Sequence, residues 1–186
     1  MKKRILHVIP TLDRAGAEKQ MTLLAKGLPA DEFDVHVCAL TRGGPLAAAL
    51  EKAHVPTTLI GKRWKLDPRA FWALKRLIGR LEPDLIHTWL FAANAYGRAA
   101  GMACGTKCLV AGERCVDPWK GRRDLWIDRY LARRTARIVT NSPGVKDFYV
   151  HHGLPEEKFT VIPNGIPPAK PSHTTREALL EEFELP

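Results

Sequence analysis

The chain has 186 residues, which suffices for one α/β domain with a sizeable core but is tight for two complete domains, since domains usually contain roughly 100 to 200 residues. Hydrophobic residues make up 45% and charged residues 26% of the chain, which excludes disordered and fibrous proteins. The formal net charge of +9 is compatible with an anionic partner: nucleotide phosphates, acidic lipid headgroups or nucleic acid.

The first residues predict a protein that stays in the cytoplasm. The basic start Met1–Arg4 is followed by an apolar run, Ile5–Pro10, that His7 interrupts, whereas a signal peptide has roughly 7 to 15 apolar residues there. No stretch approaches the roughly 20 uncharged apolar residues that span a bilayer. Any membrane contact is therefore expected to be peripheral, at the inner face of the membrane.

Short β-branched runs alternate with helical patterns from the first residue to about Ile162, which is typical of parallel βαβ units. The expected strands are residues 4–9, 34–40, 56–60, 84–87, 107–111, 137–140 and 159–162. The sequence therefore predicts an α/β domain with a Rossmann-like, doubly wound parallel sheet of about seven strands.

Three pairs of residues predict helix starts between these strands. Asp67-Pro68 and Ser142-Pro143 each combine an N-cap with proline at the first helical position, and Gly44-Pro45 is a weaker version. Ser142 is therefore interpreted as a helix cap rather than a nucleophile.

Two basic stretches, residues 61–82 and 119–137, each contain seven basic and two acidic residues. At helical spacing their arginines form two stripes, Arg69, Arg76 and Arg80 on the first and Arg122, Arg129 and Arg133 on the second. Each stripe is either a solvated helix face or a contact for an anionic membrane. Nucleic acid is not an expected partner, because no helix-turn-helix, RNP or zinc signature accompanies the charge.

The amino-acid composition changes around Asn164-Gly165. Four prolines within the nine residues 163–171 predict a linker there. Thr174 and Glu177 then form a capping box that opens a helix with Leu179, Leu180 and Phe183 on one side. We therefore predict one domain over residues 1–166, followed over 167–186 by an interdomain linker and the first helix of a truncated second domain.

Candidate site residues follow the strands, at the edge of a parallel sheet where ligands bind. They are Gly16 in the first turn, His87, Glu113, Arg114, Asn141, Asn164 and Gly165. His87 is either a structural residue or a ligand contact, and Glu113 either pairs with Arg114 or contacts a ligand. No metal or cofactor is expected, because the four cysteines lack CxxC spacing and there is no HExxH or Walker motif.

The order of five segments resembles the amino-terminal domain of the retaining GT-B glycosyltransferases of group 1, or family four. The segments are strand one, AGAEKQ (15–20), DLIHTW (84–89), TNSPGVKDFY (140–149) and GLPEEKFTVIPNGI (153–166). The resemblance covers about residues 4–166 and is most specific in the last segment.

The resemblance implies the acceptor half of a hexosyltransferase of polysaccharide biosynthesis. A missing carboxy-terminal domain would hold the nucleotide-sugar donor, and the acceptor would be a saccharide or lipid-linked. His87, Glu113, Arg114 and Asn141 would contact the acceptor, and Gly16, Asn164 and Gly165 would border the donor phosphates. Since Arg114 follows Glu113 where the family often has histidine, no catalytic residue is assigned. The chain alone is expected to be inactive. The alternative is a stand-alone Rossmann-like phosphate- or nucleotide-binding module.

Overall fold

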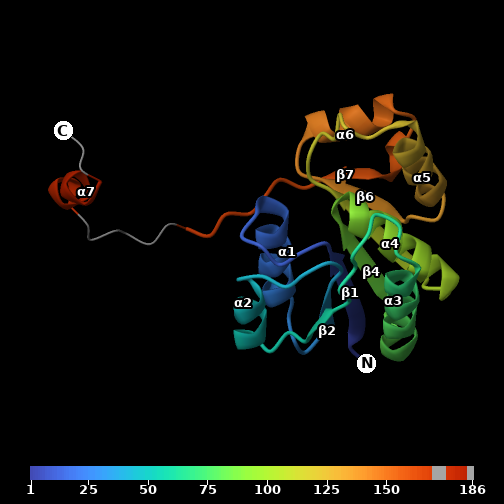
Figure 1. Ribbon diagram of the computed structural model, residues 1–186, viewed down its shortest axis with the longest axis horizontal. Coiled ribbons are helices and arrows are strands. Elements are labelled where there is room, and N and C mark those ends of the chain that lie inside the picture. The colour runs from blue at the N-terminus through green and yellow to red at the C-terminus, as the bar shows by residue number, and fades with distance from the viewer. Residues whose placement is uncertain (169–174, 184–186) are drawn as a thin grey trace.

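The computed structural model describes residues 1–168 and 175–183, and its core is a seven-stranded parallel sheet (Figure 1). The strand order is β3-β2-β1-β4-β5-β6-β7, and every neighbouring pair is parallel. The strands are β1 Lys3–Ile9, β2 Phe33–Ala39, β3 Thr57–Leu59, β4 Leu85–Trp89, β5 Cys108–Glu113, β6 Arg137–Thr140 and β7 Phe159–Val161. The predicted fold class is confirmed.

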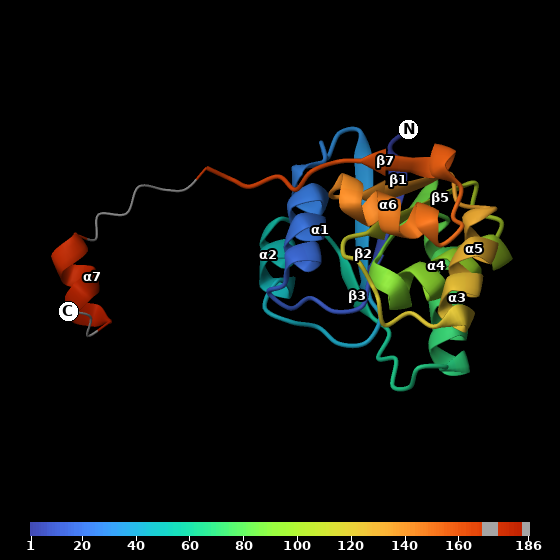
Figure 2. The same cartoon turned by 90° about the horizontal axis from the view of Figure 1, so that it is seen from above.

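Helices connect the strands and cover both faces of the sheet (Figure 2). They are α1 Gly16–Gly27, α2 Ala47–Lys52, α3 Pro68–Leu81, α4 Leu90–Ala103, α5 Arg122–Ala132 and α6 Pro143–His151, with a 3-10 turn at Glu156–Lys158 and α7 Arg176–Glu182 beyond the sheet. Helices α1 and α2 pack on one face, over Ile9, Val37 and Trp89. Helices α3 and α4 pack on the other, over Leu6 and Ile86, and α5 and α6 extend that layer over Ala111 and Ile138. None of the described helices is long and apolar enough to span a membrane.

Two of the three predicted helix starts are confirmed. The Asp67 carboxylate accepts the N–H of Ala70 at 3.2 Å, and the Ser142 hydroxyl accepts that of Val145 at 3.4 Å. The prediction at Gly44-Pro45 is wrong in position, because α2 begins at Ala47 without a side-chain cap. Gly44 instead permits a close approach of two loops, since a Cβ there would lie 2.3 Å from the backbone oxygen of Leu12.

A helix follows the linker, as the sequence predicts, but its cap differs. The Thr175 hydroxyl accepts the N–H of Ala178 at 3.2 Å. The predicted cap, Thr174, lies outside the described residues. The division of the chain at residue 166 stays a prediction.

Helix α4 packs closely on the sheet because two glycines one turn apart, Gly97 and Gly101, face it. A Cβ on Gly97 would lie 2.4 Å from Cγ2 of Thr88, and one on Gly101 would lie 2.7 Å from a methyl carbon of Leu109. Thr88 cannot rotate away freely, because its hydroxyl donates to Asn94 at 2.7 Å. The distance between helix and sheet is therefore set by the missing side chains.

We expect Gly97→Ala to lower the free energy of unfolding by about 1 to 3 kcal/mol, as overpacking of a close contact does. The matched control is Gly79→Ala in α3, where an added Cβ meets nothing within 4 Å. That change should be neutral or stabilise by up to about 1 kcal/mol through helix propensity. Urea unfolding of both variants measures the difference, and equal stability of the two would contradict this account of α4.

Candidate functional site

The candidate site lies at the switch point of the sheet, where the chain has moved outward from β1 to β3 and returns to β4 on the other side of β1. His7 on β1 pairs in register with His87 on β4, and their rings are 5.3 Å apart. The His87 ring stacks on Trp89 at 4.4 Å, and Nε1 of Trp89 donates to Nδ1 of His7 at 3.2 Å. An aromatic cluster thus forms the floor of the site.

Both histidines of this cluster are neutral at pH 7. Burial lowers the pKa of His7 to about 4. Burial, with His7 and Arg114 nearby, holds the pKa of His87 well below its usual range. Nε2 of each ring has no hydrogen-bond partner within the described part of the chain. His87 is 8% exposed and its Nε2 is buried, so this ring is mainly a packed side chain that borders the pocket.

Arg114 carries positive charge to this aromatic floor. Its guanidinium lies over the Trp89 ring at 4.6 Å, and Nη1 donates to Oδ1 of Asn164 at 3.4 Å. A pocket of about 550 Å³ is lined by His87, Trp89 and Arg114, together with Gly165 and residues of α1. Three of the predicted site residues, His87, Arg114 and Gly165, therefore share one pocket, and Asn164 contacts it through Arg114.

Gln20 joins α1 to the segment that leaves the sheet. Its amide nitrogen donates to the carbonyl of Gly165 at 2.7 Å, and its amide oxygen accepts the N–H of Gly165 at 3.0 Å. Gly16 is the first residue of α1, one turn before Gln20, and no side chain caps that helix end. The structure therefore links Gly16 and Gly165 through one helix. The sequence did not indicate Gln20 as a site residue, because no local pattern marks its contact with Gly165.

Glu113 points away from the pocket, because successive residues of a strand face opposite sides of the sheet. It is 2% exposed, accepts from Asn94 at 2.8 Å and from the Tyr149 hydroxyl at 3.0 Å, and lies 3.7 Å from Lys120. The alternative of an ion pair with Arg114 is wrong, since the charged partner is Lys120. Acceptor contact by Glu113 stays a prediction, and any such role is indirect in this geometry.

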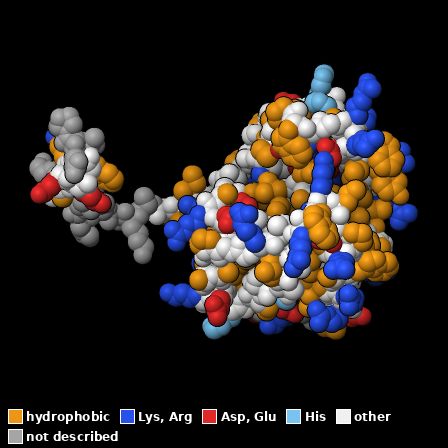
Figure 3. Space-filling model, in the orientation of Figure 1, with side chains coloured by type: hydrophobic (Ala, Val, Ile, Leu, Met, Phe, Trp, Pro, Cys, Tyr) orange, Lys and Arg blue, Asp and Glu red, His pale blue; other side chains and the backbone are white. Residues whose placement is uncertain are grey.

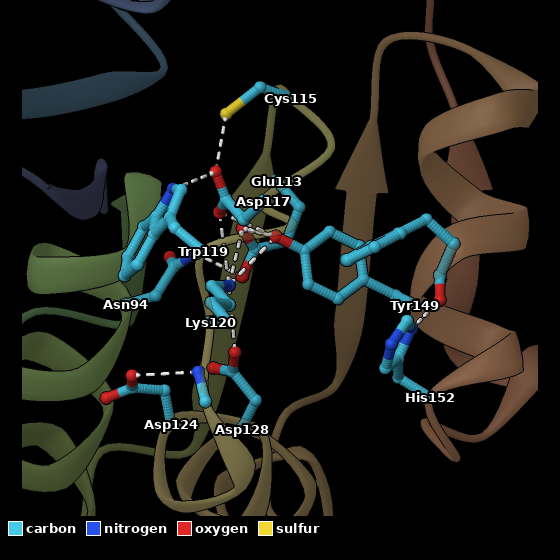
Figure 4. Close-up of polar contacts among 12 residues, drawn as sticks. Asn94, Glu113, Cys115, Asp117, Trp119, Lys120, Asp124, Asp128, Tyr149 and His152 are labelled. Atoms are coloured by element: carbon cyan, nitrogen blue, oxygen red, sulfur yellow. Dashed lines mark hydrogen bonds and ion pairs between the residues drawn. The ribbon is translucent and has the colours of Figure 1, made fainter.

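Lys120 lies at the centre of a buried cluster, shown in Figure 4, that fixes the loop between β5 and α5. Its ammonium donates to Asp128 at 2.9 Å and to the Tyr149 hydroxyl at 2.8 Å, and lies 3.3 Å from Asp117. Asp128 also accepts from Arg98 at 2.7 Å. Burial lowers the pKa of Lys120, but the surrounding carboxylates raise it by more, so this ammonium stays charged.

The cluster is balanced when Glu113 holds a proton. Two cations, Arg98 and Lys120, then face two carboxylates, Asp117 and Asp128. The single proton of the Tyr149 hydroxyl can be donated to Glu113 or to Asp117, at 3.0 and 2.9 Å, but not to both. Burial raises the pKa of Glu113 from 4.5 to about 7, against the opposing effect of Lys120. Protonation of Glu113 accounts for both the charge balance of the cluster and the two contacts of the Tyr149 hydroxyl.

We expect Glu113→Gln to remove a pH dependence of stability. A folded pKa above the unfolded one gives stability that is fully present below about pH 4.5 and is lost as pH rises through about 7. Wild type should therefore lose on the order of 3 kcal/mol relative to Glu113→Gln over this range. Urea unfolding between pH 4.5 and 8 measures it, with Glu156→Gln, an exposed carboxylate paired with Lys146, as control. Parallel profiles for wild type and Glu113→Gln would refute the assignment.

The remaining predicted residue, Asn141, follows β6 at the same edge, but it does not line the pocket. Its Oδ1 is buried without a partner among the described residues.

Leu90 joins β4 directly to α4 with a φ of 65°, a conformation that costs a bulky residue about 1 kcal/mol or more. This abrupt turn leaves Trp89 facing the pocket and places Asn94 within reach of Glu113. Within the described residues, no group of three or more His, Cys, Asp or Glu side chains is arranged so that it could hold a metal ion.

The doubly wound sheet, with a cationic and aromatic pocket at its switch point, is that of a Rossmann-like domain. The resemblance noted in the sequence extends over the whole of this sheet. The chain belongs to Glycosyltransferase Family 4, whose model matches residues 14–170. The expected one-half GT-B fold is confirmed.

Individual relatives agree with this membership. The chain is 24% identical over 182 residues to the Escherichia coli UDP-Gal:alpha-D-GlcNAc-diphosphoundecaprenol alpha-1,3-galactosyltransferase, covering 89% of this chain and 45% of that one. Anabaena HepE in complex with UDP superposes with a TM-score of 0.74 at 23% identity, over 89% of this chain and 44% of HepE. A Rickettsia africae glycosyltransferase gives 0.73 at 18% identity, over 100% and 50%. The chain thus spans about half the length of these relatives.

Proposed function

We propose that this chain is the acceptor-side domain of an enzyme that transfers a sugar, with retention, from a nucleotide-sugar to a saccharide or lipid-linked acceptor. The observation that carries the proposal is the pocket in which Arg114, Trp89 and His87 meet at the switch point. Its chemistry suits a sugar joined to phosphate, since aromatic rings pack on sugars and a guanidinium pairs with phosphate oxygens. Family membership and the E. coli relative, which acts on a diphosphate-linked sugar, support the same class of acceptor.

Each residue then has a physical role in this proposal. His87 has a pKa too low to take a proton efficiently near pH 7, so it positions an acceptor hydroxyl by hydrogen bonding rather than acting as a general base. Arg114 binds an acceptor phosphate, and Asn164 orients Arg114. Gly16 opens α1, whose free N–H groups favour an anion such as the donor diphosphate. A UDP-sugar is the donor we favour, because the E. coli relative uses UDP-galactose.

The chain alone should bind a donor weakly and transfer nothing. Holding the donor against the acceptor can lower the reaction barrier by roughly 7 to 11 kcal/mol. One domain alone cannot hold both substrates in this way. We expect calorimetric titration of residues 1–186 with UDP- and GDP-sugars to give Kd values of about 1 mM or weaker, which corresponds to about 4 kcal/mol. A donor-hydrolysis assay should give no turnover. Micromolar binding by the chain alone would favour the stand-alone nucleotide-binding module instead.

Arg114 offers a sharper test in a protein that also contains the donor domain. Arg114→Gln should raise the KM for a diphosphate-linked acceptor at least about tenfold, equivalent to about 1.4 kcal/mol, and leave the KM for the donor unchanged. Arg114→Lys keeps the charge but loses the stacking on Trp89 and should have an intermediate effect. Steady-state kinetics with acceptor and donor varied separately distinguish these parameters. A rise in the donor KM alone would assign Arg114 to the donor site.

A further inference from the structure

Four of the five tryptophans lie on the surface, although tryptophan is on average a highly buried residue. Trp64, Trp72, Trp119 and Trp126 are 61%, 55%, 60% and 61% exposed, and Leu66 is 82% exposed. Only Trp89 is buried. Nothing in the proposed sugar-transfer site uses the four exposed rings.

These side chains belong to segments that the fold brings together. Lys65, between Trp64 and Leu66, pairs with Asp124 in the first turn of α5 at 3.6 Å. Trp119 contacts Phe91 of α4 edge-on at 5.4 Å. On α5, Trp126 stacks on the exposed Tyr130 at 5.6 Å. We call the surface formed by the loop 61–66, the exposed sides of α3 and α5, and Trp119 the aromatic–basic face.

Most of its basic side chains are exposed, whereas most of its acidic ones are not. The arginines of both predicted stripes are exposed, and residues of the opposite helix sides, such as Leu74 and Leu131, are buried. Asp67 and Asp128 are buried, and the Asp124 side chain is only 14% exposed. Figure 3 shows hydrophobic and basic side chains side by side over the part of the surface where α3 to α5 lie. The face therefore presents aromatic rings within a field of positive charge.

An apolar hollow of about 360 Å³ lies within this face, between α3 and α4. Leu66, Phe71 and Tyr96 line it. The face thus combines an apolar hollow with positively charged surroundings, which distinguishes it from a basic helix that only faces solvent.

We propose that the aromatic–basic face docks the protein on an anionic lipid bilayer, with Trp64, Leu66, Trp119 and Trp126 entering the headgroup region. Tryptophan favours that region because its ring is apolar and its N–H is polar, and lysine and arginine are attracted to anionic headgroups. Neither preference needs a partner of fixed shape, which suits an array of separate rings. The proposal builds on the function above: the loop that holds Arg114 in the pocket also carries Trp119, so docking would hold the pocket beside the surface that displays a lipid-linked acceptor.

Co-sedimentation with vesicles tests the proposal. The probes are vesicles of phosphatidylcholine alone and of phosphatidylcholine with phosphatidylglycerol. The chain should bind the anionic vesicles, and either Trp64→Ala with Leu66→Ala, or Arg122→Glu with Arg129→Glu, should lower the partition coefficient at least about tenfold. The matched controls are Leu59→Ala on β3, 55% exposed, and Lys26→Glu on α1. Each should change binding less than about twofold, because neither lies on the face.

Tryptophan fluorescence tests insertion directly. Bilayer lipids with brominated acyl chains should quench wild type strongly, and the paired change at Trp64 and Leu66 should reduce the quenching. Equal binding to neutral and anionic vesicles, or binding without quenching, would overturn the proposal. So would a dimer in lipid-free solution that the same change converts to monomer, since the face would then join two copies. Vesicle binding by a protein that also contains the donor domain, yet proves inactive as a transferase, would refute the proposed function and leave the docking face standing.

Discussion

The pocket and the aromatic–basic face both depend on one interaction, the contact of the buried Lys120 ammonium with the carboxyl groups around it. A lysine buried among Glu113, Asp117 and Asp128 would be costly to leave unpaired, which favours the observed arrangement of the loop from β5 to α5. One end of that loop places Arg114 over Trp89, and the other presents Trp119 to solvent. Removing one partner would leave an unpaired charge inside the domain, and the disturbance would reach the pocket and the surface together.

The carboxyl group of Glu113 connects this loop to the helices around it. Asn94 of α4 and Tyr149 of α6 both contact its carboxyl group, and Asp128 of α5 meets Lys120 beside it. Three helices are therefore tied to one strand end through groups whose hydrogen bonds are mutually dependent. Close packing of α4 through Gly97 brings Asn94 near enough to take part.

The features predicted correctly from the sequence are those that short-range sequence signals determine. The caps at Asp67 and Ser142, the alternation of strands and helices, and the edge at which the site residues gather all follow from short-range patterns. The expected fifth strand ended at Ala111, whereas β5 continues to Glu113, and this extension decides that Glu113 faces the helices and Arg114 the pocket. The sequence offers no signal that Lys120 is buried, nor that Trp64 and Trp119 in the loops are exposed, because both depend on how distant segments pack.

The two hydrogen bonds between Gln20 and Gly165 have a mechanical consequence. They bind the departing segment to α1, so in the proposed two-domain enzyme the carboxy-terminal domain would turn about bonds after Gly165 rather than within β7. A pivot at that position lies against the same pocket that holds His87 and Arg114. Movement of such a domain would therefore open or shut the pocket at its rim while leaving its floor undisturbed.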